Sequence, residues 1–189
     1  MRNGRTTRIG TAALAGIASI SVATALGATT EKTLSSGLIS KGVPHESVLV
    51  ETLKMKKKGK VKDVNVGIAF DTASNEDYTF LLRHPSGKTI HISSGNGGSG
   101  NGYGSSTCAS AVRFDDEAGT PVEDLEGVDT LLFGQYQPEE LNEVSGTDGL
   151  SELDGLKTNG KWQLQVIDTE PVGLGSLRCF ELDFTYKKK

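Results

Sequence analysis

Short segments in which apolar residues recur at every second position constrain the fold of this chain most strongly. In 62–70, the residues Val64, Val66, Ile68 and Phe70 fall on one face of an extended segment. Such a period of two is typical of a β-strand with one buried face. Further strand-like segments are found at 47–55, 78–83, 89–93, 108–114, 130–133, 161–168 and 177–186. Because no sustained helical period follows residue 28, we predict an all-β fold.

Turn residues separate these segments. Glycine accounts for 24 of the 189 residues and proline for only 5, which favours many tight turns and excludes a collagen-like repeat. About eight short strands punctuated in this way predict a jelly-roll-like antiparallel β-sandwich. Within it, we predict that 47–55 and 62–70 pair as a hairpin across a lysine-rich turn. The small and polar segment 29–42 is predicted to be a flexible lead-in to a domain spanning 43–189.

The first 28 residues have the order of a secretory signal peptide. Arg2, Arg5 and Arg8 precede an uncharged apolar stretch, and small residues follow it up to Ala28. A basic start, an apolar centre and a small-residue exit are the signature of export. An uncleaved membrane anchor is the alternative, but a stretch of about 18 residues diluted by Gly, Ser and Thr is at the lower limit for a span. We predict a secreted, extracellular protein, cleaved after Ala25 or Ala28, with no stable membrane span after cleavage.

Export changes the interpretation of the cysteines. The chain has two, Cys108 and Cys179. In an oxidising compartment an even pair favours one disulfide, and the alternative is two unpaired thiols buried in strands. Two cysteines alone exclude a disulfide-dense scaffold and a four-cysteine zinc site.

Several short motifs follow one another through most of the segment 43–186. The most specific is NGKWQLQVID at 159–168, with the pattern Asn-Gly-x-Trp-x-Leu-x-Val-x-Asp. The others are LRHPSG at 82–87, GGSGN at 97–101, FDDEA at 114–118, GQYQP at 134–138, GSL at 175–177 and LDF at 182–184. In this order they resemble the P domain, also called the P/Homo B domain, which follows the subtilisin-like catalytic domain in kexin, furin and many bacterial secreted proteases.

The resemblance implies a non-catalytic module, since in that family it stabilises a neighbouring catalytic domain and tunes its response to calcium or pH. The mature chain has fewer than roughly 20 residues outside the match, far too few for a catalytic domain. None of the three histidines, His45, His84 and His91, has a serine-nucleophile motif beside it,. We therefore predict no catalytic and no cofactor-binding residues, and a secreted subtilisin-like protease as a separate partner chain.

Loop carboxylates offer a candidate metal site. Asp77 closes one loop, and Asp115 and Asp116 begin another. Calcium prefers carboxylate and carbonyl oxygens, and the resemblance extends to secreted bacterial proteins that carry structural calcium. If these three residues converge at one end of the sandwich, they form a calcium site. The alternative is a solvated acidic surface.

Two further features have both a structural and a binding interpretation. Trp162 shares its strand face with aliphatic residues, so we predict a core anchor and not a ligand-stacking surface. Six lysines between Lys54 and Lys62 are predicted to form a solvated hairpin tip that discourages edge pairing, with a polyanion-binding patch as the alternative. The glycine-rich stretch 95–102 lacks the following helix of a dinucleotide site and is predicted to be a long flexible loop.

The net charge and the composition limit the classes of function that are open to this chain. The net charge is −4, aromatic residues make up 6%, and loss of the three N-terminal arginines takes the charge to −7. Both properties argue against nucleic-acid binding. We predict a secreted accessory module that associates with subtilisin-like serine proteases. The alternative is an extracellular adhesion or glycan-binding jelly roll, which an exposed row of aromatic side chains would favour.

Overall fold

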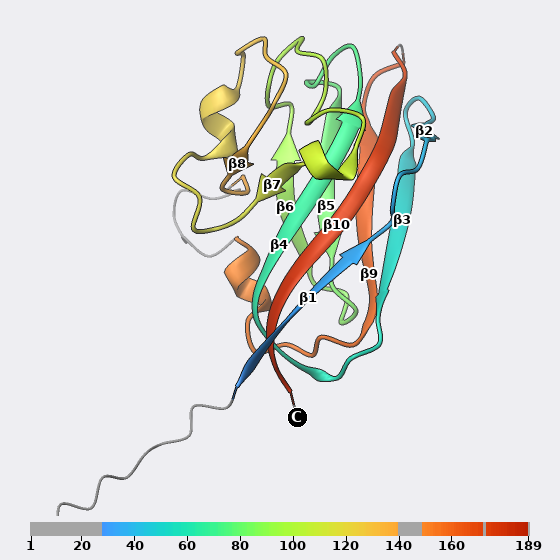
Figure 1. Cartoon of the computed structure of the whole chain (residues 1–189). Helices are drawn as coiled ribbons and strands as arrows, with labels where there is room; N and C mark the ends of the chain where they lie inside the picture. The colour runs from blue at the N-terminus through green and yellow to red at the C-terminus, as the bar shows by residue number, and fades with distance from the viewer. Residues whose placement is uncertain (1–27, 140–148, 172, 189) are drawn as a thin grey trace, which may run out of the picture.

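The computed structural model describes residues 28–139, 149–171 and 173–188. These residues form a sandwich of two β-sheets (Figure 1). Among them are ten strands: β1 (Thr29–Ser35), β2 (Lys41–Val43), β3 (Val48–Met55), β4 (Gly59–Asp71), β5 (Tyr78–Arg83), β6 (Thr89–Ser94), β7 (Val112–Phe114), β8 (Gln135–Tyr136), β9 (Gly160–Asp168) and β10 (Gly175–Lys188). Three short 3-10 helices lie between strands: η1 (Cys108–Ser110), η2 (Val122–Leu125) and η3 (Leu150–Leu153). No helix of the described residues is long and apolar enough to cross a membrane.

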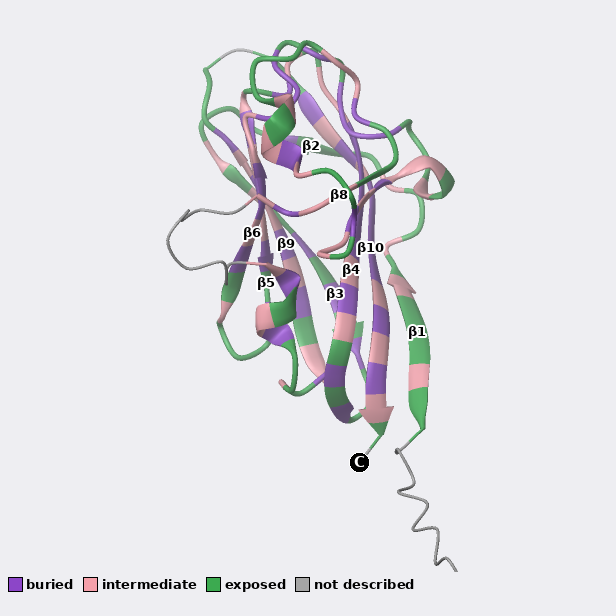
Figure 2. Ribbon diagram, turned by 90° about the vertical axis from the view of Figure 1, so that its left-hand side faces the viewer, coloured by how far each residue is buried: buried purple, intermediate pink, exposed green. Residues whose placement is uncertain are grey.

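One sheet has the order β1-β10-β4-β7-β8, with β2 also paired with β10, and the other has the order β3-β9-β5-β6. We call the first the β10 sheet and the second the β9 sheet. Their inner faces form one core, and buried residues alternate with more exposed ones along β4 and β10 (Figure 2). The largest fully buried side chains include Trp162, Tyr78, Tyr103, Phe70 and Phe80.

The predicted all-β sandwich is confirmed, and most predicted strands agree with the observed ones to within a few residues. The number of strands is ten in the described part of the chain, where about eight were expected,. One pair departs from the antiparallel pattern, because β7 and β8 run parallel. Of the two weaker predicted strands, 108–114 begins with η1, and 130–133 contributes only an isolated bridge between Leu132 and Tyr103.

The predicted hairpin of 47–55 and 62–70 is wrong. β3 pairs with β9, whereas β4 pairs with β10 and β7, so the two strands belong to different sheets. The lysine-rich turn between them crosses from one sheet to the other. A period of two shows that one face of each strand is buried, but it does not identify the strand that supplies the hydrogen bonds.

The predicted flexible lead-in at 29–42 is also wrong. β1 pairs with β10 over seven residues, from Thr29 opposite Lys187 to Ser35 opposite Glu181, and β2 pairs with the start of β10. Most of β1 is exposed, so its sequence carries little apolar signal. What holds it is the backbone edge of the long strand β10, whose N–H and C=O groups need partners.

The glycine-rich segment is packed and does not form a free loop. A Cβ atom at Gly100 would lie 1.9 Å from the carbonyl oxygen of Thr130, and one at Gly102 would lie 2.3 Å from that of Phe70. The buried Asn75 side chain accepts a hydrogen bond from the Gly102 N–H at 2.7 Å and donates one to the Thr130 carbonyl at 3.0 Å. Glycine is required here because neighbouring backbones approach too closely for a side chain.

Candidate functional site

Asp115 and Asp116 lie together just after β7 and organise the chain around them. Asp116 accepts hydrogen bonds from the backbone N–H groups of Leu150 and Ser151 at 2.9 and 2.6 Å, which fixes the start of η3. Asp115 accepts one from the Glu117 N–H at 2.9 Å and one from the Asn65 side chain at 3.3 Å. Both carboxylates therefore have structural partners.

These two residues belong to a larger acidic cluster, which we define as Asp63, Asp115, Asp116, Glu117 and Asp154. Burial and then repulsion from Asp115 raise the pKa of Asp63. A side-chain hydrogen bond with Asp115 and then burial raise the pKa of Glu117, and burial raises that of Asp154. A hollow of about 30 Å³ lies among members of the cluster, with Lys62 at its wall. It has room for about one water molecule or ion.

Asp77 does not join this cluster. Asp115 contacts Asn65 near the middle of β4, whereas Asp77 precedes β5 beyond the far end of β4. Asn65 and Asp71 are six positions apart in β4, a distance of roughly 20 Å along a strand. Burial raises the pKa of Asp77, with repulsion from Glu76 and Asp168 adding to it. The predicted convergence of Asp77 with Asp115 and Asp116 is therefore not observed.

Cys108 and Cys179, the pair that the sequence offers as a disulfide, are bonded in the structure, with their Cα atoms 5.2 Å apart. The bond joins η1 to β10. It ties the loop that follows the glycine-rich segment to β10, which lies between β1 and β4 in its sheet. Among the described residues no cysteine is free.

The three histidines have separate surroundings. His45 Nδ1 lies 3.9 Å from Asp168 Oδ2, and His91 Nδ1 lies 3.7 Å from Glu139 Oε2. His84 is buried, and its Nδ1 accepts a hydrogen bond from the Ser86 N–H at 2.9 Å while Nε2 donates to the Lys157 carbonyl at 2.9 Å. Burial lowers the pKa of His84. In the described part of the chain, no histidine bridges a serine hydroxyl and a carboxylate.

Trp162 is confirmed as a core anchor. It is fully buried, packs edge-on against Phe184 and His84, and donates its indole N–H to the Thr158 carbonyl at 2.9 Å. The neighbouring Gly160 has a φ of 141°, and a Cβ atom there would lie 2.5 Å from Pro85. The start of the motif at 159–168 is thus explained by the close packing of β9 against the turn at 84–88. Asp168 ends the motif and accepts the Glu170 N–H at 2.9 Å, as a turn-capping residue does,.

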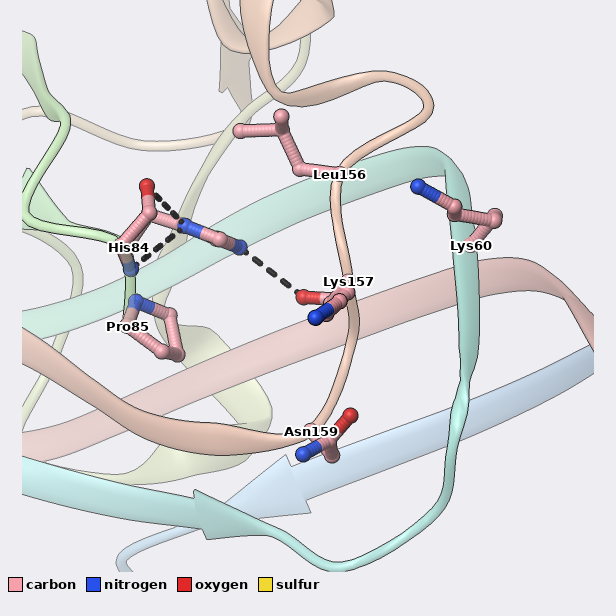
Figure 3. Close-up of a pocket in the computed structure, with 7 residues that line it drawn as sticks. Lys60, His84, Pro85, Leu156, Lys157 and Asn159 are labelled. Atoms are coloured by element: carbon pink, nitrogen blue, oxygen red, sulfur yellow. Dashed lines mark hydrogen bonds between the residues drawn. The ribbon is translucent and has the colours of Figure 1, made fainter.

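A hollow of about 440 Å³ opens beside His84. His84 and Pro85 form one side, the segment with Leu156, Lys157 and Asn159 forms the other, and Lys60 of β4 lies beyond it (Figure 3). The hydrogen bond from His84 to the Lys157 carbonyl fastens the two sides to each other. The sequence prediction missed this hollow, since His84 and Lys157 are 73 positions apart.

The outer face of the β9 sheet carries a group of apolar side chains. Val48 and Val50 of β3 point away from the core and are 50% and 42% exposed. Val48 lies opposite Ile167 of β9, and Val50 lies in one row with Gln165 and Leu81. We call Val48, Val50, Leu81 and Ile167 the valine face. Val48 and Val50 are exposed, and Leu81 and Ile167 are half-buried. Contiguous apolar side chains on one sheet face make it a candidate interaction surface.

Comparison with solved structures identifies the fold. The chain superimposes on the serine protease of Aeromonas sobria in two crystal structures, one of which is a complex with a chaperone. In both the TM-score is 0.51 and the identity 13%, and the match covers 85% and 86% of this chain. The chain spans only 28% of the length of the chains that it matches. No family model and no curated protein sequence matches the chain.

Proposed function

We propose that this protein is a non-catalytic β-sandwich module that binds and stabilises a subtilisin-like serine protease outside the cytoplasm. The observation that carries the proposal is the structural match, because the fold of this chain corresponds to a part of a serine protease that is less than one third of its length. The order of motifs that resembles the P domain supports the same assignment. A basic, apolar and small-residue order at 1–28 supports export.

The valine face is the surface proposed to contact the protease. It lies on the outer face of the β9 sheet, and its outward-facing neighbours on β9, Gln163 and Gln165, are uncharged. Interface cores are depleted of charged residues, so this face is better suited to burial against another folded domain than the acidic loops are. The occupant that we commit to is the catalytic domain of the protease, because the matched fold belongs to such an enzyme.

The test uses the purified protein and the culture medium of the organism that produces it. A fluorophosphonate probe labels active serine proteases, so an immobilised sample of the protein is expected to retain a labelled subtilisin-like enzyme. Added to that enzyme after purification, the protein is expected to lengthen its half-life at elevated temperature, because a ligand that binds only the native state stabilises it.

A pair of variants locates the contact. Val48→Asp together with Val50→Asp places charges in the proposed interface and is expected to weaken binding at least about tenfold. Val128→Asp is the control, since Val128 is 46% exposed in the loop between η2 and β8, outside the valine face. Failure to capture a labelled protease, or an unchanged half-life at saturating protein, would contradict the proposed function.

A further inference from the structure

The end of the sandwich at which the chain terminates collects positive charge from several segments. The turn between β3 and β4 supplies Lys56, Lys57 and Lys58. Lys54 lies opposite Lys161, and Lys60 lies opposite both Lys187 and Lys157. Segments separated by more than 100 residues thus place their lysines at one end, although the chain as a whole has a net charge of −4.

Three adjoining hollows open at this basic end. The hollow beside His84 shares Lys157 and Asn159 with a second one of about 260 Å³ that reaches Lys58. On its other side it shares the turn at 84–86 with a third one of about 420 Å³, which extends to Arg83, Lys161 and Gln163. Five cations line the three hollows, namely Lys58, Lys60, Arg83, Lys157 and Lys161, and no carboxylate does.

These five cations have no ion-pair partner among the described residues, although four other cations do: Lys41, Lys88, Arg113 and Arg178. Lys60 and Lys157 even face each other across an isolated β-bridge. Like charges placed directly opposite each other destabilise a strand pair. An anion bound between them would relieve this repulsion.

The other residues that line the three hollows indicate which class of ligand they suit. The apolar side chains that line the three hollows are those of Pro85 and the half-buried Leu156. Neither is a large exposed side chain of the kind that inserts into a membrane or anchors a protein interface. Of the described residues that line the hollows, none is a Phe, Tyr or Trp of the kind that stacks nucleic-acid bases,. Asn159 and Gln163 have side-chain amides with no hydrogen-bond partner among the described residues. Amides beside lysines suit a ligand that carries both hydroxyl and acidic groups.

We propose that the basic end binds a linear anionic polysaccharide, with its carboxylate or sulfate groups at Lys60 and Lys157 and its hydroxyl groups at Asn159 and Gln163. His84 is neutral in this arrangement and holds the two sides of the central hollow together through its bonds to Ser86 and Lys157. The proposed site adjoins the valine face at Gln163 but includes none of its four residues, and it does not depend on the protease function.

Heparin is the probe. The full protein is expected to bind immobilised heparin at pH 7 and about 0.15 M salt, and rising salt is expected to release it because screening weakens exposed charge interactions. Lys60→Gln together with Lys157→Gln is expected to raise the dissociation constant about tenfold, the loss that follows from removing two partly exposed charged contacts.

The matched control is Lys32→Gln together with Lys41→Gln. It removes the same charge from residues that line none of these hollows, and it is expected to change the dissociation constant less than about twofold. Because Lys41 is paired with Glu51, thermal melting of this variant is measured as well. Circular dichroism establishes that both variants are folded. No retention on heparin, an equal loss in the control pair, or equally tight binding of polyglutamate or duplex DNA of the same total charge would overturn the proposal.

Discussion

At the scale of single residues, several side chains that resemble functional groups serve the fold. Trp162 closes the core and bonds to Thr158, and His84 pins the turn at 84–88 to the segment before β9. Asp116 fixes the start of η3 through two backbone N–H groups. In each case the polar atom has a backbone partner, which is what a buried polar group requires.

We expect Trp162→Ala to lower the free energy of unfolding by roughly 3–5 kcal/mol, because it leaves a large cavity between the sheets. Equilibrium denaturation in urea measures the change. Lys161→Ala is the control on the exposed face of the same strand and is expected to change stability by less than about 0.5 kcal/mol. A Trp162→Ala protein of normal stability would show that the core assignment is wrong.

The raised pKa values in the acidic cluster predict how the stability of the protein depends on pH. The pKa of Asp63 is raised in the folded protein by burial and by Asp115, Asp154 and Asp116. A carboxyl group with a raised pKa begins to destabilise the fold as the pH rises through its unfolded-state pKa, and the effect is complete above its folded-state pKa. It has almost no effect below about pH 3, where the group is largely protonated in both states. We therefore expect Asp63→Asn to raise stability by roughly 0.5–1 kcal/mol at pH 7 and to leave it unchanged near pH 3.

Thermal melting at the two pH values checks this expectation, and calcium provides a second readout of the same residues. If the cluster holds the ion, millimolar calcium raises the melting temperature of the wild-type protein, and a chelator reverses the rise. Asp115→Asn is expected to abolish the effect of calcium. A melting temperature that does not respond to calcium would leave the cluster as plain surface charge.

At the scale of elements, β10 organises the molecule. It pairs with β1, β2 and β4, and through Cys179 it is bonded to η1. The strands at its edge, β1 and β2, contribute few buried side chains. Their positions follow from the length of β10 and its need for backbone partners, which a hydrophobic pattern in their own sequences cannot show.

Removal of the disulfide tests how far β10 depends on it. The bond closes a loop with a sequence separation of 71 residues, for which the chain-entropy model gives about 4 kcal/mol. We expect Cys108→Ser together with Cys179→Ser to lower the free energy of unfolding by up to this amount, measured by denaturation under non-reducing conditions. Equal stability of the variant and the oxidised wild type would mean that the bond adds nothing to the fold.

At the scale of the whole molecule, charge is distributed unevenly over the sandwich. Lysines of the turn between β3 and β4, of the segment before β9 and of the end of β10 meet at one end, while Glu76, Asp77 and Asp168 lie at the other. The net charge of −4 conceals this arrangement. A composition-based argument against binding polyanions therefore does not apply to the basic end, because local charge governs such binding.

The sequence alone determined the all-β class, the burial of Trp162 and the limits of strands such as β5 and β9, because the alternation of apolar residues along a strand is a local property. It also indicated which two cysteines were available to pair. The tertiary structure decided which strands are neighbours, as in the placement of β3 and β4 in different sheets. It likewise separated Asp77 from Asp115 and brought Lys60 next to Lys157. Contacts between residues far apart in the chain depend on how the strands are ordered in the sheets, and a local pattern carries no information about that order.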